Sequence, residues 1–176
     1  MLTIPGSTPA DTLIIGCGNL IRGDDAAGPI LVRRLADVTL PAGVRLLDGG
    51  TAGMDVAFAM RGVRRVIIVD ASRVGVPAGT IHHVPGEELM NLSPPSGNLH
   101  QFRWDQALGF ATWLLKDEYP ENVEVWLVEG EQFEPGAELS VAVDEAIGVI
   151  ADRILESLDT VAKPPLVAAP GTRDAR

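Results

Sequence analysis

The sequence has very little cysteine, an excess of acid over base and no long apolar run. The single cysteine, Cys17, excludes an internal disulfide and a multi-cysteine zinc site. Because Cys17 lies between two glycines after an apolar run, we expect it to pack as a small buried residue and not to act as a nucleophile.

Charge and hydropathy exclude two classes of partner. The chain has 24 acidic and 14 basic residues, and the resulting net charge of −10 repels nucleic acid and anionic lipid. No apolar run approaches the roughly 18 residues that a membrane helix needs. The first residues lack the basic start and apolar core of a signal peptide. We therefore expect a cytoplasmic protein that binds neither nucleic acid nor membrane.

Several common catalytic and nucleotide-binding motifs are also missing. A dinucleotide fingerprint would need glycine where the chain has Ile21, and the Gly-Lys-Ser/Thr of a phosphate loop is absent. Asp24 and Asp25 would repel a phosphate at the point where it should bind. The chain has no His-Glu-x-x-His helix and no Gly-x-Ser-x-Gly elbow, which disfavours a zincin and a serine hydrolase.

The length and the distribution of proline and glycine predict one domain with two loose ends. Residues 1–10 contain two prolines, a glycine and a serine, and we interpret them as a flexible arm. Residues 11–160 form the predicted domain, and a chain of this size buries roughly 70% of its unfolded surface without a disulfide. Residues 161–176 contain three prolines and few large apolar side chains, which predicts a disordered tail.

Hydrophobic periodicity predicts alternating strands and helices. Apolar and β-branched runs predict strands at Thr12–Ile15, Val44–Leu47, Val66–Asp70, Thr80–Val84 and Val123–Val128. Helical spacing predicts helices at about Pro29–Leu35, Met54–Met60, Gln101–Leu115 and Val141–Leu158. This order indicates an α/β three-layer sandwich, with a mostly parallel twisted sheet of about five strands and helices on both faces.

Three carboxylates follow the ends of predicted strands, at the edge where ligands bind in such folds. Asp25 follows the first strand in a glycine-rich loop, Asp48 ends the second strand and Asp70 ends the third. Because parallel strands end at the same edge of a sheet, we expect the three side chains to share one rim. Asp24 and Asp48 are candidate helpers, although helix capping or loop geometry is the commoner role for aspartates so placed.

His100 is the histidine best placed to join these carboxylates. It precedes a predicted helix, whose dipole disfavours the imidazolium and leaves a neutral ring that can bind a metal. His82 and His83 lie on opposite faces of a predicted strand, where a surface role explains at least one of them. Asp25, Asp70 and His100 lack the fourth protein ligand of tetrahedral zinc, so such a site would complete its coordination with groups from a partner.

Four ordered motifs resemble those of the hydrogenase maturation endopeptidases. Residues 16–28, GCGNLIRGDDAAG, resemble the N-terminal signature of that family, and residues 46–54, LLDGGTAGM, resemble its second glycine loop. Residues 66–71, VIIVDA, resemble its third strand with the terminal aspartate, and residues 77–80, PAGT, resemble the turn that follows. The similarity covers roughly residues 13–158.

The resemblance implies an endopeptidase that removes the C-terminal extension of a [NiFe]-hydrogenase large-subunit precursor after nickel insertion. The acidic nickel contacts of the family fall on Asp25 and Asp70, and its histidine falls on His100. The resemblance also implies that nickel is supplied by the cysteines of the substrate and is not stably bound by the free enzyme. Asp25, Asp70 and His100 are thus the predicted catalytic and metal-contacting residues of an aspartic-type peptidase that is monomeric when free.

The cleavage chemistry and two other functions remain open at this stage. Nickel can polarise the scissile carbonyl or activate a water, or an aspartate can act as general base while nickel only positions the bond. The alternative function is a nickel-binding assembly chaperone without peptidase activity, using the same rim. A nucleotide-binding protein of similar topology is a third hypothesis, which stabilisation by a dinucleotide would favour.

Overall fold

The computed structural model describes residues 11–89 and 104–162, and its centre is a five-stranded sheet. The strand order is β2-β1-β3-β5-β4, in which β4 alone runs antiparallel to its neighbour. The strands are β1 (Thr12–Cys17), β2 (Val44–Gly50), β3 (Arg65–Ser72), β4 (Ile81–Pro85) and β5 (Asn122–Glu129). Four parallel strands therefore end at the same edge, as the order of elements predicted.

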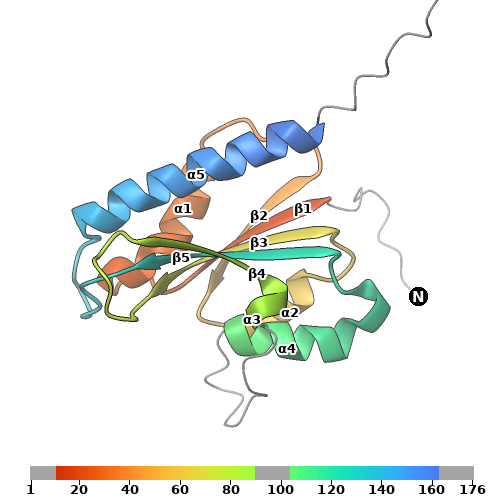
Figure 1. Cartoon of the computed structure of the whole chain (residues 1–176), viewed down its shortest axis with the longest axis horizontal. Coiled ribbons are helices and arrows are strands. Elements are labelled where there is room, and N and C mark those ends of the chain that lie inside the picture. The colour runs from red at the N-terminus through yellow and green to blue at the C-terminus, as the bar shows by residue number, and fades with distance from the viewer. Residues whose placement is uncertain (1–10, 90–103, 163–176) are drawn as a thin grey trace, which may run out of the picture.

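Helices cover both faces of the sheet (Figure 1). One face carries α1 (Ala27–Ala36) and the long α5 (Val141–Ala162), and the other carries α2 (Gly53–Ala59), α3 (Gly86–Leu89) and α4 (Trp104–Leu115). Short 3-10 turns, η1 (Gly23–Ala26) and η3 (Lys116–Glu118), precede α1 and follow α4. The predicted three-layer α/β sandwich is confirmed.

Strand β3 holds the two apolar layers together. Val66 and Ile68 point to the layer under α2 and α4, while Ile67 and Val69 point to the layer under α1 and α5. All four side chains are fully buried. A central parallel strand is covered on both faces, which is why this stretch is apolar at every position and shows no alternation. Burial of each side chain stabilises the fold by about 1.5–3 kcal/mol.

The element boundaries differ from the predicted ones mainly at the carboxyl ends of the strands. β1 continues to Cys17 and β2 to Gly50, so residues interpreted as loop take part in the sheet ladder. The short α3 was not predicted. The described part of α4 begins at Trp104, and α5 ends at Ala162, two residues into the predicted tail. The predicted arm 1–10, the helix start at Gln101 and the rest of the tail lie outside the described residues.

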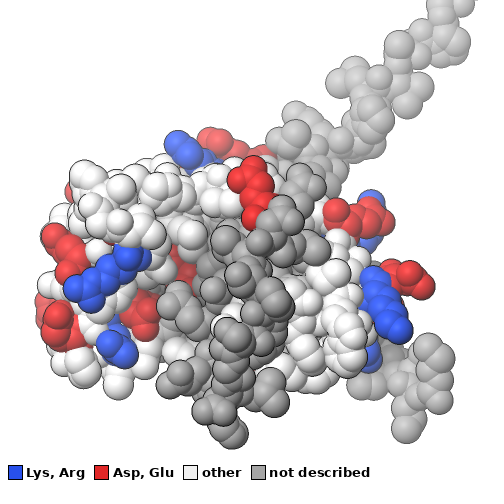
Figure 2. Space-filling model, turned by 60° about the horizontal axis from the view of Figure 1, so that its bottom comes forward, with Lys and Arg blue, Asp and Glu red and all other residues white. Residues whose placement is uncertain are grey.

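Charges of both signs are mixed on the described surface. On the face shown in Figure 2, acidic and basic side chains are interspersed at both ends of the molecule. This mixture differs from the contiguous basic stripe that binds a phosphate backbone. In the described ranges, no helix has both the length and the apolarity to cross a membrane.

Candidate active site

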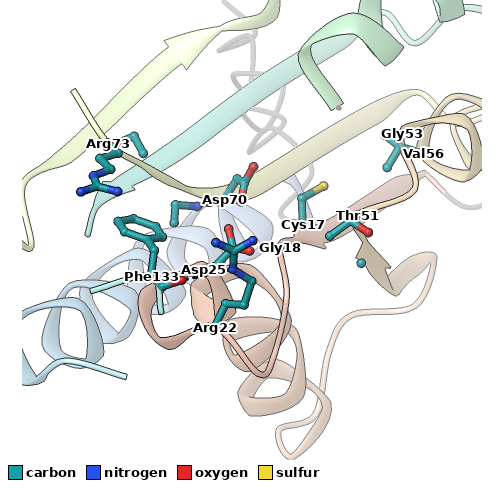
Figure 3. A pocket seen from close by; sticks show the side chains of 13 residues that line it. Cys17, Gly18, Arg22, Asp25, Thr51, Gly53, Val56, Asp70, Arg73 and Phe133 are labelled. Atoms are coloured by element: carbon teal, nitrogen blue, oxygen red, sulfur yellow. Dashed lines mark hydrogen bonds between the residues drawn. The ribbon is translucent and has the colours of Figure 1, made fainter. Parts of the chain in front are cut away.

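A cavity of about 350 Å³ opens at the carboxyl ends of β1 and β3. Both Asp25 and Asp70 line it, although 44 residues lie between them in the chain. The β1–η1 loop, the start of α2, the end of β3 and the loop after β5 contribute the remaining walls (Figure 3). Asp25 and Asp70 thus share one cavity, as we expected from their positions after the ends of parallel strands.

Close backbone packing carries Asp25 to this edge. A Cβ atom at Gly16 would overlap the carbonyl group of Gly28, and a Cβ atom at Gly28 would overlap the carbonyl oxygen of Val69. Only glycine lets the first turn of α1 lie directly against the ends of β1 and β3. Asp25, in the 3-10 turn just before α1, is therefore held beside Asp70, near the end of β3.

Gly18 lies between the two carboxylate-bearing segments. Its φ of +124° is one that side-chain-bearing residues rarely adopt. An added Cβ atom would overlap the carbonyl oxygen of Asp25 and would lie 3.4 Å from Oδ1 of Asp70. The Asn19 N–H donates to the same Asp25 carbonyl oxygen at 3.0 Å and closes the loop. Glycine at this position therefore lets the Asp25 backbone lie close to the Asp70 side chain.

The two aspartates differ in their surroundings. Asp70 is only 5% exposed, and its Oδ1 accepts a hydrogen bond of 2.8 Å from the N–H of Ala71. Asp25 is half-buried, and its backbone carbonyl oxygen lies beside Gly18. A buried, hydrogen-bonded carboxylate has a fixed orientation, whereas a half-buried one can meet an incoming ligand. The pair therefore offers a metal or substrate one rigid and one accessible carboxylate ligand.

Cys17 is part of the cavity wall but not a nucleophile. Burial, together with the negative charges of Asp70 and Asp48, raises the pKa of the Cys17 thiol far above its ordinary value. The reactive form of cysteine is the thiolate, which this environment suppresses. The structure agrees with the prediction that Cys17 packs as a small buried residue.

Asp24 has a structural role. It is fully buried, and its two carboxylate oxygens accept hydrogen bonds from the backbone N–H groups of Glu131, Gln132 and Ser140, at 2.7–3.1 Å. These bonds fasten the loop after β5, which carries Phe133 into the cavity wall, to the start of α1. Loop geometry, the commoner role for this aspartate, is the one observed.

Asp48 does not line the cavity. It lies within β2, where its Oδ1 accepts a hydrogen bond of 3.2 Å from the N–H of Gly50. Asp25 and Asp70 therefore line the cavity, whereas Asp48, although its charge acts on the Cys17 thiol, does not. The reason is local, because the carboxylate of Asp48 is used by the turn at the end of its own strand.

The histidines are placed differently from one another. His100 lies outside the described residues, so its predicted contact with Asp25 and Asp70 stays a prediction. His83 stacks on Trp126, and its Nε2 lies 2.7 Å from Glu124 Oε2. Neither His82 nor His83 lines the cavity. Within residues 11–89 and 104–162, no group of three or more His, Cys, Asp and Glu side chains is arranged to hold a metal.

Sequence reasoning did not identify the cationic and aromatic part of the wall. Arg22, Arg73 and Phe133 line the same cavity as the aspartates. The Arg22 Nε–H donates to the Phe133 carbonyl oxygen at 3.1 Å, and the Arg73 guanidinium lies 5.6 Å from the centre of the Phe133 ring. The available signal was position, since Arg22 is inside the first motif and Arg73 follows Asp70 by three residues.

Glu129 holds the loop that carries Arg73. At 1% exposure, its carboxylate accepts hydrogen bonds from Ser72 Oγ at 2.9 Å, Val74 N–H at 2.8 Å and Gly75 N–H at 2.6 Å. Burial by itself would raise the pKa of Glu129, but the backbone and side-chain hydrogen bonds outweigh it and lower the pKa below its ordinary value. Glu129 is therefore a buried carboxylate that stays ionised.

Comparison with known proteins identifies the family. Residues 29–157 match the family model described as hydrogenase maturation protease. A Methanocaldococcus jannaschii relative described as a hydrogenase maturation protease is 32% identical over 155 residues, 82% of this chain and 96% of that protein. The hydrogenase 2 maturation protease of Escherichia coli is 31% identical over 149 residues, 83% of this chain and 89% of that protein.

Solved structures agree with this assignment. The hydrogenase maturating endopeptidase HybD of Escherichia coli superposes with a TM-score of 0.72 at 28% identity, over 85% of this chain and 93% of that one. The same five-stranded, mostly parallel sheet with helices on both faces is thus shared with an endopeptidase. The chain belongs to the hydrogenase maturation protease family, and the predicted enzyme class, a maturation endopeptidase that hydrolyses peptide bonds, is confirmed.

Proposed function

We propose that this chain removes the C-terminal extension of a [NiFe]-hydrogenase large-subunit precursor after nickel insertion. The observation that carries the proposal is that Asp25 and Asp70 line one open cavity at the strand ends, together with Gly18. The family membership supplies the reaction class. The proposal places the reaction in the cytoplasm, with the free enzyme as a monomer.

Recognition of the substrate-borne nickel is assigned to Asp25 and Asp70, with His100 as the third contact. Substrate thiolates are soft ligands for nickel, and carboxylate oxygen and imidazole nitrogen can fill its remaining positions. Two or three protein donors are too few for a stable site, so the enzyme would bind the loaded precursor in preference to the empty one. One added ligand suffices for a tenfold preference, which needs about 1.4 kcal/mol.

The cavity also contains the groups that hydrolysis requires from the protein. A carboxylate facing the cavity can accept a proton from the attacking water as general base. Nickel bound to the precursor would supply Lewis-acid polarisation of the scissile carbonyl. The fixed orientation of Asp70 favours it as the positioning group, and the accessibility of Asp25 favours it as the group that moves a proton.

Incubation with nickel-loaded and nickel-free precursor, followed by mass measurement of the large subunit, tests the proposal. We expect a mass loss only for the loaded precursor. Asp25→Asn, Asp70→Asn and His100→Ala should abolish the mass loss while the protein stays folded, and Asp152→Asn, at an exposed position of α5, should leave it intact. Full processing by the Asp25 and Asp70 variants would reject the site.

A second measurement separates the peptidase from the nickel chaperone. Equilibrium dialysis of the free protein against nickel should show no tight stoichiometric binding if nickel arrives with the substrate. Tight binding without cleavage of the loaded precursor would favour the nickel-binding assembly chaperone. Tight binding with cleavage would contradict only the proposed source of the metal.

A further inference from the structure

The cavity has a second chemical side, opposite in charge to the aspartates. Arg73 and Phe133 lie together on one side, and Asp25 and Asp70 lie between them and the wall formed by Cys17 and Thr51 (Figure 3). Arg22 extends toward the centre of the cavity from the β1–η1 loop. In the part of the chain that the structure describes, neither Arg22 nor Arg73 forms an ion pair with a carboxylate.

The position of Arg73 is built into the fold. Glu129 accepts hydrogen bonds from Ser72 on one side of Arg73 and from Val74 and Gly75 on the other, so the backbone is fixed on both sides of this arginine. The guanidinium then lies over the Phe133 ring, 5.6 Å from its centre. An exposed arginine loses much conformational entropy when it binds a ligand, and such anchoring reduces that cost.

Phe133, whose ring lies under the Arg73 guanidinium, is also held in place by a buried carboxylate. Asp24, through its bonds to Glu131 and Gln132, holds the loop that carries Phe133. The Arg22 Nε–H donates to the Phe133 carbonyl oxygen, which leaves the terminal amino groups of Arg22 available to other acceptors. Two buried carboxylates outside the cavity thus support two cations inside it.

We propose that Arg73 and Arg22, which both contact Phe133, form a subsite that binds a carboxylate of the client polypeptide next to the metal-bearing segment. Guanidinium groups bind carboxylates with paired, charge-assisted hydrogen bonds. The cavity then attracts a positive centre on the aspartate side and a negative group on the arginine side. Such a dipolar cavity fixes the direction in which a peptide enters, and therefore which bond faces the aspartates.

This inference rests on the proposed function for its substrate, so its first test needs no peptidase activity. The full chain, labelled with ¹⁵N, is titrated with N-acetyl-aspartate amide and with the neutral N-acetyl-asparagine amide, and the Nε–Hε signals of Arg22 and Arg73 are followed. We expect saturable shifts with the charged compound only. Arg73→Gln should abolish them, and Arg153→Gln, which changes an arginine over Trp126 on another face, should not. Equal responses to both compounds, or none, would overturn the subsite.

A second test uses the nickel-loaded precursor and separates substrate binding from catalysis. Arg73→Gln should raise KM about tenfold, equivalent to about 1.4 kcal/mol, with kcat changed less than twofold, and Arg73→Lys should restore part of the loss. A fall in kcat at constant KM would overturn the proposal, because the guanidinium would then act on the transition state. If wild-type enzyme cleaves no precursor, the proposed function fails while the titration still decides the subsite.

Glu129 is a positioning residue in this scheme, and a double-mutant cycle tests it. Ser72→Ala removes one of its hydrogen bonds and should raise KM. Combined with Arg73→Gln, it should raise KM no further than Arg73→Gln does alone. Additive effects would show that the loop contributes to binding by another route and would overturn the positioning role.

Discussion

Two adjacent aspartates in this chain have opposite roles. Asp24 is fully buried and uses both carboxylate oxygens on backbone N–H groups of a distant loop, whereas Asp25 is half-buried and faces the cavity. The two side chains differ because the 3-10 turn rotates successive residues to different sides. Stability and activity can therefore be separated by substitution at neighbouring positions.

Replacing Asp24 with alanine should destabilise the protein severely. The change removes the acceptor of the N–H groups of Glu131, Gln132 and Ser140; the Ser140 bond is buried and the other two are part-buried. One unsatisfied buried donor costs about 1–3 kcal/mol, so we expect a loss of at least about 1–3 kcal/mol in the free energy of unfolding. Urea denaturation measures it, with Asp152→Ala on exposed α5 as the control that should change little. A loss as small as that of the control would contradict the fastening role.

Gly18→Ala should remove activity by displacing Asp25 relative to Asp70. The added Cβ would overlap the Asp25 carbonyl oxygen and approach Asp70. Gly62→Ala is a matched control, because Gly62 also has a positive φ, +69°, but an added Cβ there would meet no atom within 4 Å. Both variants should lose about 1 kcal/mol or more of stability through backbone strain.

Only the Gly18 variant should also lose cleavage of nickel-loaded precursor, by about 100-fold, the effect expected when reacting groups are displaced by about 1 Å. Thermal melts and mass measurement of the product provide the two readouts. Comparable cleavage by the two alanine variants would mean that the space beside Gly18 is not used.

At the scale of elements, the β3–β4 loop depends on one buried charge. The ionised Glu129 carboxylate accepts hydrogen bonds from the loop, through Ser72, Val74 and Gly75. Because folding lowers the pKa of Glu129, the carboxylate binds a proton less readily in the folded state than in the unfolded state. The resulting stabilisation is fully present above the ordinary value of 4.5 and is lost as pH falls through the lower pKa of the folded state.

The comparison of wild type with Glu129→Gln tests this pH dependence. At neutral pH the variant should be less stable, because an amide cannot replace the charged acceptor of several N–H groups. The difference in the free energy of unfolding should narrow as pH falls below about 4.5. Urea titrations at several pH values measure it, and a difference that stays constant with pH would contradict the assignment.

The sequence predicted the elements better than the contacts between loops. The apolar stretch Val66–Asp70 and the glycines of the first motif were sufficient to predict a buried strand, a sharp turn and the meeting of Asp25 with Asp70, because these depend on local patterns and on the topology of parallel sheets. The Glu129 and Asp24 contacts join segments 54–116 residues apart. No short-range pattern encodes such pairs, which is why Arg73 and Phe133 were missed.

At the scale of the whole molecule, the cavity lies at the margin of the two apolar layers. One apolar layer lies between the sheet and α2 with α4, and the other lies between the sheet and α1 with α5. The cavity lies at the strand ends, where Cys17 and Val56 of the first layer and Ala71 of the second meet glycines and charged groups. Stability thus comes chiefly from the two layers, and chemistry comes from the edge that they hold in place.

Substitutions deep in the two layers should therefore lower stability without changing catalysis. Leu108 on α4 and Ile147 on α5 are fully buried on opposite faces of the sheet. Each change to alanine should cost about 2–5 kcal/mol, through lost burial and the cavity that remains. Because the two sites share no contacts, the loss of unfolding free energy in the double variant should equal the sum of the two single losses to within about 0.5 kcal/mol.

At a temperature where they stay folded, the single variants should cleave nickel-loaded precursor with wild-type kcat and KM. A fall in kcat in a variant whose circular dichroism is native would show that the edge depends on the packing of that layer, and would join two functions that the architecture keeps apart.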